Sequence, residues 1–290
     1  MNVLLTGATG FLGSHLARKL VRSGHELTAI RRRSSSLSRV QDIESEIRWF
    51  TVNPSGEVDA AAFAGMDVVV HTAATYGRSG EAMAEVAETN TVFSLRILEA
   101  AVCHGIRKFI NTDSALPPET NPYTLAKAQF AQWGKYACES GKIQFINLRL
   151  EHFYGPGDEE SKFTCRVIKT CLRNQPELKL TAGTQKRDFI YVADVVDALY
   201  LLIVQNLATA GNYVDIPLGS GTATTVRELV ETIHQLSQST TRLVFGAIPM
   251  KPNDVMLSCA DISMLEELGW KPTTSLREGL ELTIRNANLT

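Results

Sequence analysis

The sequence has no excess of charge of either sign and no long hydrophobic run. Lysine and arginine together number 29, and aspartate and glutamate number 31, so the formal net charge is −2. A chain this close to neutrality gives no reason to expect binding to nucleic acid or to an anionic membrane surface. The longest apolar stretch, residues 198–204, is far too short to cross a bilayer. We therefore expect no nucleic-acid partner and no membrane partner.

Paired cysteines and metal-binding motifs are also missing. The five cysteines are widely spaced and form no C-x-x-C pair, which is typical of reduced thiols in a cytosolic protein. The six histidines include no H-E-x-x-H motif, so we expect no metal site. The opening Met1-Asn2-Val3 lacks the charged segment of a signal peptide. These features predict a cytoplasmic protein.

The sequence does contain enough apolar residues to form a large core, because 44% of its 290 residues are hydrophobic. Short apolar runs at 3–5, 26–30, 47–52, 67–71, 108–111 and 143–148 alternate with helical patterns at 11–21, 81–103 and 122–140. Such alternation predicts an α/β fold with a doubly wound parallel sheet and helices on both faces.

The alternation becomes less regular after residue 150, where Gly155-Pro156-Gly157 predicts a turn. We predict a dinucleotide-binding Rossmann domain over residues 1–151, completed by about 188–212. Residues 152–187 and 213–290 are then expected to form a smaller C-terminal substrate-binding lobe.

A glycine-rich turn, G-A-T-G-F-L-G at residues 7–13, joins the first strand to the first helix. The free N–H groups and the dipole of a helix N-terminus favour a pyrophosphate, and glycines let the backbone approach it closely. A tight turn without a ligand is the alternative. The turn predicts a set of cofactor-binding residues, namely Gly7, Thr9, Gly10, Phe11, Leu12 and Gly13.

The residues after the second strand predict NADP(H) rather than NAD. An NAD site places an Asp or Glu about 20 residues beyond the glycines, where it binds the ribose 2′-hydroxyl. Here the chain continues Arg31-Arg32-Arg33-Ser34, and the paired donors of a guanidinium suit a 2′-phosphate. We expect Arg31 and Arg32 to bind this phosphate with support from Ser34. A solvated basic loop is the alternative.

Tyr123 and Lys127 lie four residues apart on a predicted helix and therefore share one face. A phenol has an ordinary pKa of about 10, which a neighbouring ammonium and a cationic nicotinamide would lower. Tyr123 is then expected to give a proton to a carbonyl oxygen while hydride reaches the carbon.

Further segments extend these motifs into a family resemblance. They are D-V-V-V-H-T-A-A at 67–74, R-L-E-H-F-Y-G-P-G at 149–157, R-D-F-I-Y-V at 187–192, K-P-N-D at 251–254 and L-G-W-K-P at 268–272. With the glycine turn and the Tyr–Lys pair, they make the chain resemble the extended short-chain dehydrogenase/reductase family, in its NAD-dependent epimerase/dehydratase group. The resemblance covers nearly the whole chain.

The resemblance implies roles for residues beyond those argued above. Thr112 falls where the family has a catalytic Ser or Thr beside Tyr123 and Lys127, and Lys127 would also bind the nicotinamide ribose. The implied cofactor contacts are Asn53, Thr72, Ala73, Ala74, Asn90, Tyr123 and Lys127. The implied substrate contacts are Asp113, Ser114, His152, Arg187 and Lys251, of which Arg187 and Lys251 would hold the phosphates. The family also implies a homodimer, paired through the helices around 81–103 and 121–140.

Departures from the family pattern reduce the number of family reactions that this chain is expected to catalyse. Dehydratases of this family carry Asp-Glu after the catalytic Thr, whereas this chain has Asp113-Ser114 and so lacks the expected base. Enzymes that form GDP-fucose carry a cysteine at the Ser114 position. His152 replaces the usual Asn and either contacts the sugar or nicotinamide or fills space.

Four segments are most similar to reductases of CDP-4-keto-3,6-dideoxyglucose. They are T-D-S-A-L-P at 112–117, Y-T-L-A-K at 123–127, R-L-E-H-F-Y-G-P-G-D at 149–158 and Q-K-R-D-F-I-Y at 185–191. The resemblance thus implies NADPH-dependent reduction of the C4 ketone of a nucleotide-linked deoxysugar. Two alternatives stay open. One is an NAD-retaining nucleotide-sugar epimerase or dehydratase, and the other is a non-catalytic dinucleotide-binding protein, which would usually lack the Tyr–Lys pair.

Overall fold

The computed structural model describes all residues of the chain except 140, 208–211, 251, 253 and 288–290, and it divides into two compact units. The first unit comprises residues 1–150 and 196–216, and the second comprises 151–195 and 217–290. The sequence placed residues from about 188 onward in the first domain. Strand β9 (Lys186–Tyr191) instead pairs with β11 (Ala223–Thr225) and β7 (His152–Tyr154), so its backbone hydrogen bonds belong to the second unit.

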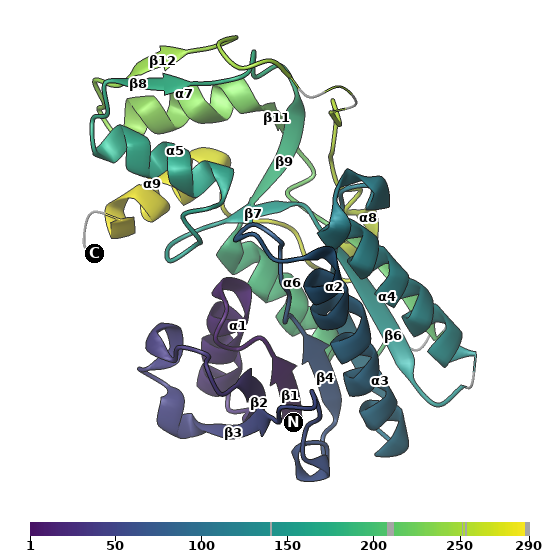
Figure 1. The fold of residues 1–290 in the computed structure, drawn as a ribbon. Coiled ribbons are helices and arrows are strands. Elements are labelled where there is room, and N and C mark those ends of the chain that lie inside the picture. The colour runs from purple at the N-terminus through teal and green to yellow at the C-terminus, as the bar shows by residue number, and fades with distance from the viewer. Residues whose placement is uncertain (140, 208–211, 251, 253, 288–290) are drawn as a thin grey trace. The chain divides into compact units, whose positions relative to one another are not determined.

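A seven-stranded sheet forms the centre of the first unit, in the order β10-β6-β5-β4-β1-β2-β3 (Figure 1). Its strands are β1 (Asn2–Thr6), β2 (Glu26–Arg32), β3 (Ile47–Val52), β4 (Val68–His71), β5 (Lys108–Ser114), β6 (Gln144–Leu150) and β10 (Tyr213–Leu218). Every strand pair from β3 across to β6 is parallel. The chain reverses its direction of travel across the sheet between β1 and β4, where doubly wound folds bind ligands. The predicted fold class is therefore confirmed.

Helices cover both faces of this sheet (Figure 1). On one face, α1 (Phe11–Arg22) and α6 (Val192–Val204) are joined by the ion pair of Lys19 with Asp197. On the other face, α3 (Ser94–Cys103) and α4 (Pro122–Cys138) pack on a buried row of register partners, namely Leu4, Val69, Phe109 and Phe145. Burial on both faces explains why these strands are almost continuously apolar.

The helix expected over 81–103 is interrupted in the structure. It consists of α2 (Met83–Ala87), a π-helical turn over Glu88–Phe93, and α3. The wider turn carries the fully buried Asn90, so the interruption places a polar side chain inside the unit. Short 3-10 turns occur at Ser38–Val40, Glu44–Glu46, Ala60–Ala62 and Pro118–Thr120.

In the described residues, the second unit contains two small sheets and several helices. Figure 1 shows these elements. One sheet has the order β11-β9-β7, and the other pairs β12 (Arg242–Val244) with β8 (Glu177–Lys179). The helices are α5 (Phe163–Leu172), α7 (Val226–Leu236), α8 (Ser263–Glu267) and α9 (Leu276–Ala287). Its core includes Ile168, Leu229 and Leu280, and the Tyr154 hydroxyl donates to Leu276 O at 3.1 Å.

All five cysteines are free thiols. In the part of the chain that the structure describes, no helix is both long and apolar enough to span a membrane. Over the same residues, no group of three or more His, Cys, Asp or Glu side chains is arranged to hold a metal ion.

Candidate functional site

The glycine turn forms a closely packed cradle at the start of α1. Gly7 has a φ of +77°, and Gly10 N donates to Gly7 O at 2.9 Å. A Cβ added at Gly13 would lie 2.0 Å from Gly7 O, and one added at Gly7 would lie 2.6 Å from Ala73 N. Among the described residues, no side chain caps the N-terminus of α1 and no acidic residue occupies its first turn. This combination fits a phosphate group, which needs close backbone approach and N–H donors that are not already capped.

The segment after β4 is held against this turn by hydrogen bonds. Thr72 Oγ1 donates to Thr6 O at 2.8 Å. Asn90 Nδ2 donates to Thr75 O at 2.8 Å and to Val86 O at 2.9 Å, while its Oδ1 accepts from Thr75 N at 3.0 Å. Asn90 therefore uses both amide donors inside the protein and positions the 72–75 segment, and it stays a predicted cofactor contact. Thr72, Ala73 and Ala74 are half-buried beside the turn and stay predicted cofactor contacts.

The arginines predicted to read the cofactor lie at the carboxyl end of β2. Arg31 is half-buried, with its guanidinium 5.4 Å from the centre of the Trp49 ring, and its buried Nε has no hydrogen-bond partner among the described residues. Arg32 and Ser34 are exposed. This end of the strand therefore offers guanidinium donors beside the glycine turn, which is connected to β2 through β1.

Asn53, which stays a predicted cofactor contact, makes hydrogen bonds within its own loop. Its Oδ1 accepts from Glu57 N and Ser55 Oγ, both at 2.8 Å, and its Nδ2 donates to Glu57 Oε2 at 3.1 Å. The side chain therefore closes the loop that follows β3. Asn and Asp commonly stabilise turns in this way, and nothing in the sequence distinguished that role from ligand binding.

Thr112, Tyr123 and Lys127 meet where β5 ends and α4 begins. Helix α4 starts with Asn121 as its cap, whose Oδ1 accepts from Thr124 N at 3.0 Å, and with Pro122 in the first position. Thr112 and Asp113 are neighbours near the carboxyl end of β5, and Tyr123 and Lys127 lie in the first two turns of α4, the helix that follows this strand. The structure thus brings the three predicted catalytic residues to one end of the sheet.

The Thr112 hydroxyl is directed toward the protein. Its residue is 6% exposed, and Oγ1 donates to His71 O at 3.0 Å. A ketone oxygen is only an acceptor, so Thr112 must rotate its hydroxyl hydrogen away from His71 to donate to a substrate.

The pKa of the half-buried Tyr123 phenol is raised well above its ordinary value. Burial is the main cause, Tyr76 and Asp113 raise it further, and Arg78 lowers it. The sequence argument expected Lys127 to make the phenol more acidic. Lys127 is itself 1% exposed, and burial lowers its own pKa to about 8. The protein residues by themselves therefore keep Tyr123 protonated at neutral pH.

Lys127 is a buried ammonium without a bonded counter-ion. Its Nζ has no hydrogen-bond partner within the described part of the chain, and the effect of Asp113 on its pKa only partly offsets the effect of burial. The fully buried His71 nearby has a pKa lowered well below its ordinary value, first by burial and then by Lys127, so its imidazole is neutral. An unpaired buried charge of this kind is costly and is characteristic of functional sites.

The side chains of Asp113 and Ser114 both accept hydrogen bonds from other residues of the protein. Asp113 is 7% exposed, its Oδ2 accepts from Asn147 Nδ2 at 2.9 Å and its Oδ1 accepts from Ser114 N at 2.7 Å. Ser114 Oγ accepts from Leu116 N at 3.2 Å. These bonds orient Asp113, whose negative charge acts on Lys127 and Tyr123, and Asp113 and Ser114 stay predicted substrate contacts.

Sequence reasoning missed Tyr76 and Arg78. The Tyr76 ring centre lies 4.8 Å from that of Tyr123, and the Arg78 guanidinium lies 4.8 Å from the Tyr76 ring centre. Both residues follow β4 at the carboxyl end of the sheet, where a doubly wound fold binds its ligands, and that position was the available signal.

The second unit carries the other predicted substrate contacts. Arg187 on β9 is 7% exposed and pairs with Asp254 at 3.0 Å, while its Nη1 donates to Lys186 O at 2.9 Å. His152 begins β7, and its ring centre lies 5.8 Å from that of Phe189. Lys251, the second predicted phosphate contact, lies outside the described residues.

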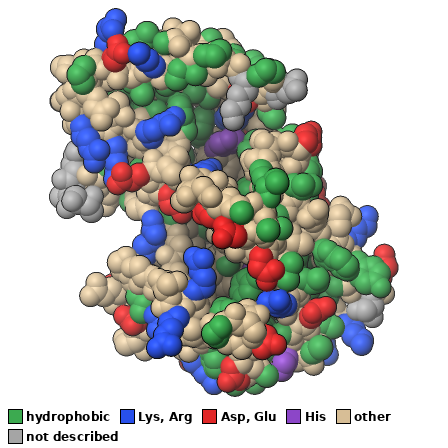
Figure 2. All heavy atoms as spheres, viewed as in Figure 1, with side chains coloured by type: hydrophobic (Ala, Val, Ile, Leu, Met, Phe, Trp, Pro, Cys, Tyr) green, Lys and Arg blue, Asp and Glu red, His purple; other side chains and the backbone are tan. Residues whose placement is uncertain are grey.

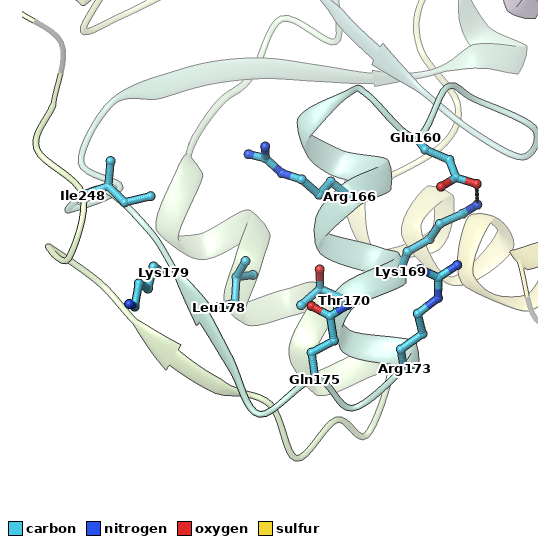
Figure 3. A pocket seen from close by; sticks show the side chains of 9 residues that line it. All are labelled: Glu160, Arg166, Lys169, Thr170, Arg173, Gln175, Leu178, Lys179 and Ile248. Carbon is cyan, nitrogen blue, oxygen red and sulfur yellow. Dashed lines mark hydrogen bonds and ion pairs between the residues drawn. The ribbon is translucent and has the colours of Figure 1, made fainter.

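A cavity of about 440 Å³ also lies on the second unit, between α5 and β8 (Figure 3). Four cationic side chains, Arg166, Lys169, Arg173 and Lys179, line it with Glu160, and Lys169 pairs with Glu160. The two arginines and Lys179 are exposed. The cavity contains none of the residues predicted to bind cofactor or substrate.

Comparison with known proteins gives concordant matches. Residues 3–216 match the model of the NAD dependent epimerase/dehydratase family. The CDP-abequose synthase of Salmonella typhimurium is 31% identical over 293 residues, which cover 96% of each chain. The UDP-glucose 4-epimerase of Thermotoga maritima, crystallised with UDP-glucose, superposes with a TM-score of 0.85 at 26% identity, covering 100% of this chain and 99% of that one. MoeE5, in complex with UDP-glucuronic acid and NAD, gives 0.87 at 27% identity with the same coverage.

Proposed function

The chain belongs to the NAD dependent epimerase/dehydratase family, and from this premise we propose that it reduces the C4 ketone of a nucleotide-linked deoxysugar with NADPH. Similarity to a CDP-abequose synthase along 96% of both chains supports an enzyme that modifies a nucleotide sugar in deoxysugar biosynthesis. CDP-4-keto-3,6-dideoxyglucose is the substrate that this similarity favours. The observation that carries the proposal is the position of Tyr123 one helical turn before Lys127 on α4, where the buried Nζ of Lys127 has no hydrogen-bond partner among the described residues.

The first unit has the features that a nicotinamide dinucleotide needs. A pyrophosphate would be held by the turn at Gly7, Gly10 and Gly13, where a side chain added at Gly7 or Gly13 would collide with the backbone. Arg31 and Arg32 would bind the 2′-phosphate of NADP(H), since guanidinium groups stand where NAD sites carry a carboxylate. The nicotinamide dinucleotide of MoeE5 supports the class of cofactor. The bound dinucleotide would supply hydride.

Protonation favours reduction over oxidation at this site. A ketone that accepts hydride needs a proton on its oxygen, and a phenol kept neutral by burial is ready to give one. Thr112 orients the carbonyl oxygen once its hydroxyl turns from His71 O. The Lys127 ammonium stabilises the phenolate that remains after proton transfer and restores the balance of charge in the buried site.

The decisive experiment offers the purified protein a panel of CDP-, dTDP-, GDP- and UDP-linked 4-ketosugars with NADPH or NADH. Stoichiometric oxidation of NADPH, with the C4 alcohol identified by NMR, is the expected result, and the CDP-linked substrate should react fastest. If every ketosugar in the panel leaves NADPH unoxidised, the proposal is wrong.

An epimerase is the second candidate, because the chain superposes on UDP-glucose 4-epimerase with a TM-score of 0.85. An epimerase must first remove a proton from the C4 hydroxyl, which requires phenolate rather than phenol. Such an enzyme would hold NAD(H) through purification and interconvert nucleotide sugars without net consumption of cofactor. Release of NAD(H) from the denatured protein, together with epimerisation of a UDP- or CDP-hexose, would favour this reading.

We also propose that two copies of the chain pair through α2, α3 and α4. Large apolar side chains are exposed on α2, on the π turn that precedes α3 and on α4, namely Met83, Val92, Leu125, Trp133 and Tyr136. Figure 2 shows apolar surface over α3 and α4. Contiguous exposed apolar residues of this kind mark interaction surfaces. Light scattering should find a dimer that Trp133→Glu with Tyr136→Glu converts to monomer. An unchanged mass for the double variant, or a monomeric parent, would exclude this interface.

A further inference from the structure

Glu151 is a buried carboxylate that neither the sequence argument nor the proposed reaction uses. It is 6% exposed and stands immediately before β7. Its Oε1 accepts from Ser258 Oγ at 2.7 Å. Its Oε2 is buried and accepts no hydrogen bond from the described residues. Leaving a carboxylate oxygen buried without a donor costs stability, so its retention calls for a partner or a task.

The imidazole of His152 lies close to this oxygen. His152 Nδ1 lies 3.5 Å from Glu151 Oε2, and it too is buried without a hydrogen bond in the described structure. A small rotation of either side chain would close this gap into a charge-assisted hydrogen bond. The guanidinium of Arg187, which also acts on this part of the second unit, is paired with Asp254. Burial lowers the pKa of Arg187, and the negative charge of Glu151 partly offsets that lowering.

Strand register places His152 and Arg187 on the same face of the β11-β9-β7 sheet. His152 is the register partner of Phe189 in the parallel pair β7–β9, and the two rings are in edge contact. Arg187 precedes Phe189 by two residues on β9, so its side chain leaves the same face of the sheet. Strand geometry then separates the two side-chain origins by about 8 Å, close enough for both to contact one diphosphate.

We propose that Glu151 is a positioning residue, which holds His152 by Nδ1 so that Nε2 donates to the substrate's diphosphate beside Arg187. A carboxylate that accepts from one ring nitrogen fixes the orientation of the imidazole, and in an imidazolium the other nitrogen is also a donor. The His152 side chain is 35% exposed while Nδ1 is buried, so the accessible part of the ring is the part away from Glu151. The inference rests on the proposed function, because it names the part of a nucleotide-linked substrate that the second unit binds.

A double-mutant cycle read out by direct binding tests this role. Calorimetry would measure the affinity of CDP, UDP, cytidine and uridine for the whole protein and for Glu151→Gln, His152→Ala and the double variant. Glu151→Gln keeps the size of the side chain and can still accept from Ser258. We expect each single change to weaken the tighter-bound nucleoside diphosphate about 10-fold, and the double change to weaken it no further. Nucleoside binding and NADPH binding should not change.

The control is Glu160→Gln, which removes an exposed carboxylate from the same unit and should leave CDP and UDP affinities unaltered. Additive losses in the double variant would overturn the proposal, because Glu151 would then act independently of His152. So would an equal loss for nucleosides, unaltered diphosphate binding in Glu151→Gln, or a parent protein that binds neither diphosphate. Turnover is not needed for this test. A protein that shows the coupled losses but reduces no ketosugar would refute only the ketoreduction, and a reductase with unaltered Glu151→Gln binding would refute only this inference.

Discussion

Two lysines near opposite ends of strand β5, the half-buried Lys108 and the buried Lys127, differ in how their ammonium groups are bonded. At the amino end, Lys108 Nζ donates to the carbonyl oxygens of Leu202 and Ile203, both at 3.1 Å, and of Gln205 at 2.5 Å. These carbonyls lie at the C-terminus of α6, where backbone acceptors lack partners within the helix. At the carboxyl end, Lys127 from α4 is more deeply buried and has no hydrogen-bond partner among the described residues.

This difference indicates that the amino end of β5 stabilises the fold, whereas the carboxyl end contributes to the candidate site. Burial lowers the pKa of both lysines, but only Lys108 receives three acceptors in return. Doubly wound sheets bind ligands at the carboxyl ends of their strands, and there an unpaired ammonium is available to a substrate or cofactor. The amino end, by contrast, holds α6 against the sheet. Variants at the carboxyl end should therefore change activity more than stability, and variants at the amino end should do the reverse.

Replacing Tyr123 with Phe should have the largest effect. Removal of the phenolic hydroxyl, which carries the acidic proton, should lower kcat by about 10²- to 10⁴-fold and leave the NADPH dissociation constant nearly unchanged. NADPH oxidation with the best ketosugar and fluorescence titration of NADPH would measure the two quantities. Tyr136→Phe is the matched control, since Tyr136 is an exposed tyrosine on the same helix. Full turnover by Tyr123→Phe would remove Tyr123 from the reaction.

The carboxyl end of β2 should determine the choice of cofactor. Arg31→Asp with Arg32→Ala replaces charge-assisted bonds to the 2′-phosphate with repulsion, so NADPH should bind about 100-fold more weakly. NADH affinity should change little, because NADH lacks that phosphate. Arg33→Ala, a change at the exposed neighbour, serves as the control. Equal losses for NADPH and NADH would mean that these arginines do not read the phosphate.

The pH dependence of turnover should report the protonation of Lys127. With a pKa of about 8, its ammonium is present at pH 7 and is lost as the pH rises through 8. We expect kcat to fall about tenfold per pH unit above that point if the cation is required. Lys127→Met should be slow at every pH and should lack this step. A parent profile that stays level to pH 9.5 would contradict the assignment.

Stability should show the smallest effect and the clearest contrast between the two lysines. Burial disfavours the protonated form of Lys127 in the folded state, so the fold should become more stable as pH rises from about 8 toward 10. Lys127→Met removes the buried charge and should stabilise the protein by up to about 3 kcal/mol at pH 7. Lys108→Met should instead destabilise it by about 1–3 kcal/mol, because carbonyls at the end of α6 lose their donor.

Urea denaturation at pH 7 and at pH 9.5 would measure these free energies of unfolding. The two variants should differ in sign at pH 7, and the advantage of Lys127→Met should shrink at pH 9.5. If both variants change the free energy of unfolding in the same direction at pH 7, the proposed difference between the two ends of β5 is wrong.

Local sequence pattern predicted the fold well. Strand β3 occupies the expected residues 47–52, and the family resemblance carried by the motifs is confirmed by the match over residues 3–216. The π turn in the predicted 81–103 helix was not foreseeable, because it depends on Asn90 reaching Thr75 fifteen residues earlier. The hydrogen bonds that the oxygens of Asn53 and Asp113 accept inside the protein were also not foreseeable, because such turn-specific or long-range bonds leave no periodic signal.

The sequence by itself determined the order of strands and helices, the glycine turn, and the presence of Tyr123 and Lys127 one helical turn apart. These follow from short-range spacing, which hydrophobic periodicity and chain stereochemistry translate directly into local structure. Only the tertiary structure decided which charged groups are paired and which are not. It neutralised His71, buried Lys127 without an acceptor, kept Tyr123 protonated and set Glu151 against His152. Protonation depends on burial and on neighbours distant in sequence, and those are settled only when the strands and helices pack together.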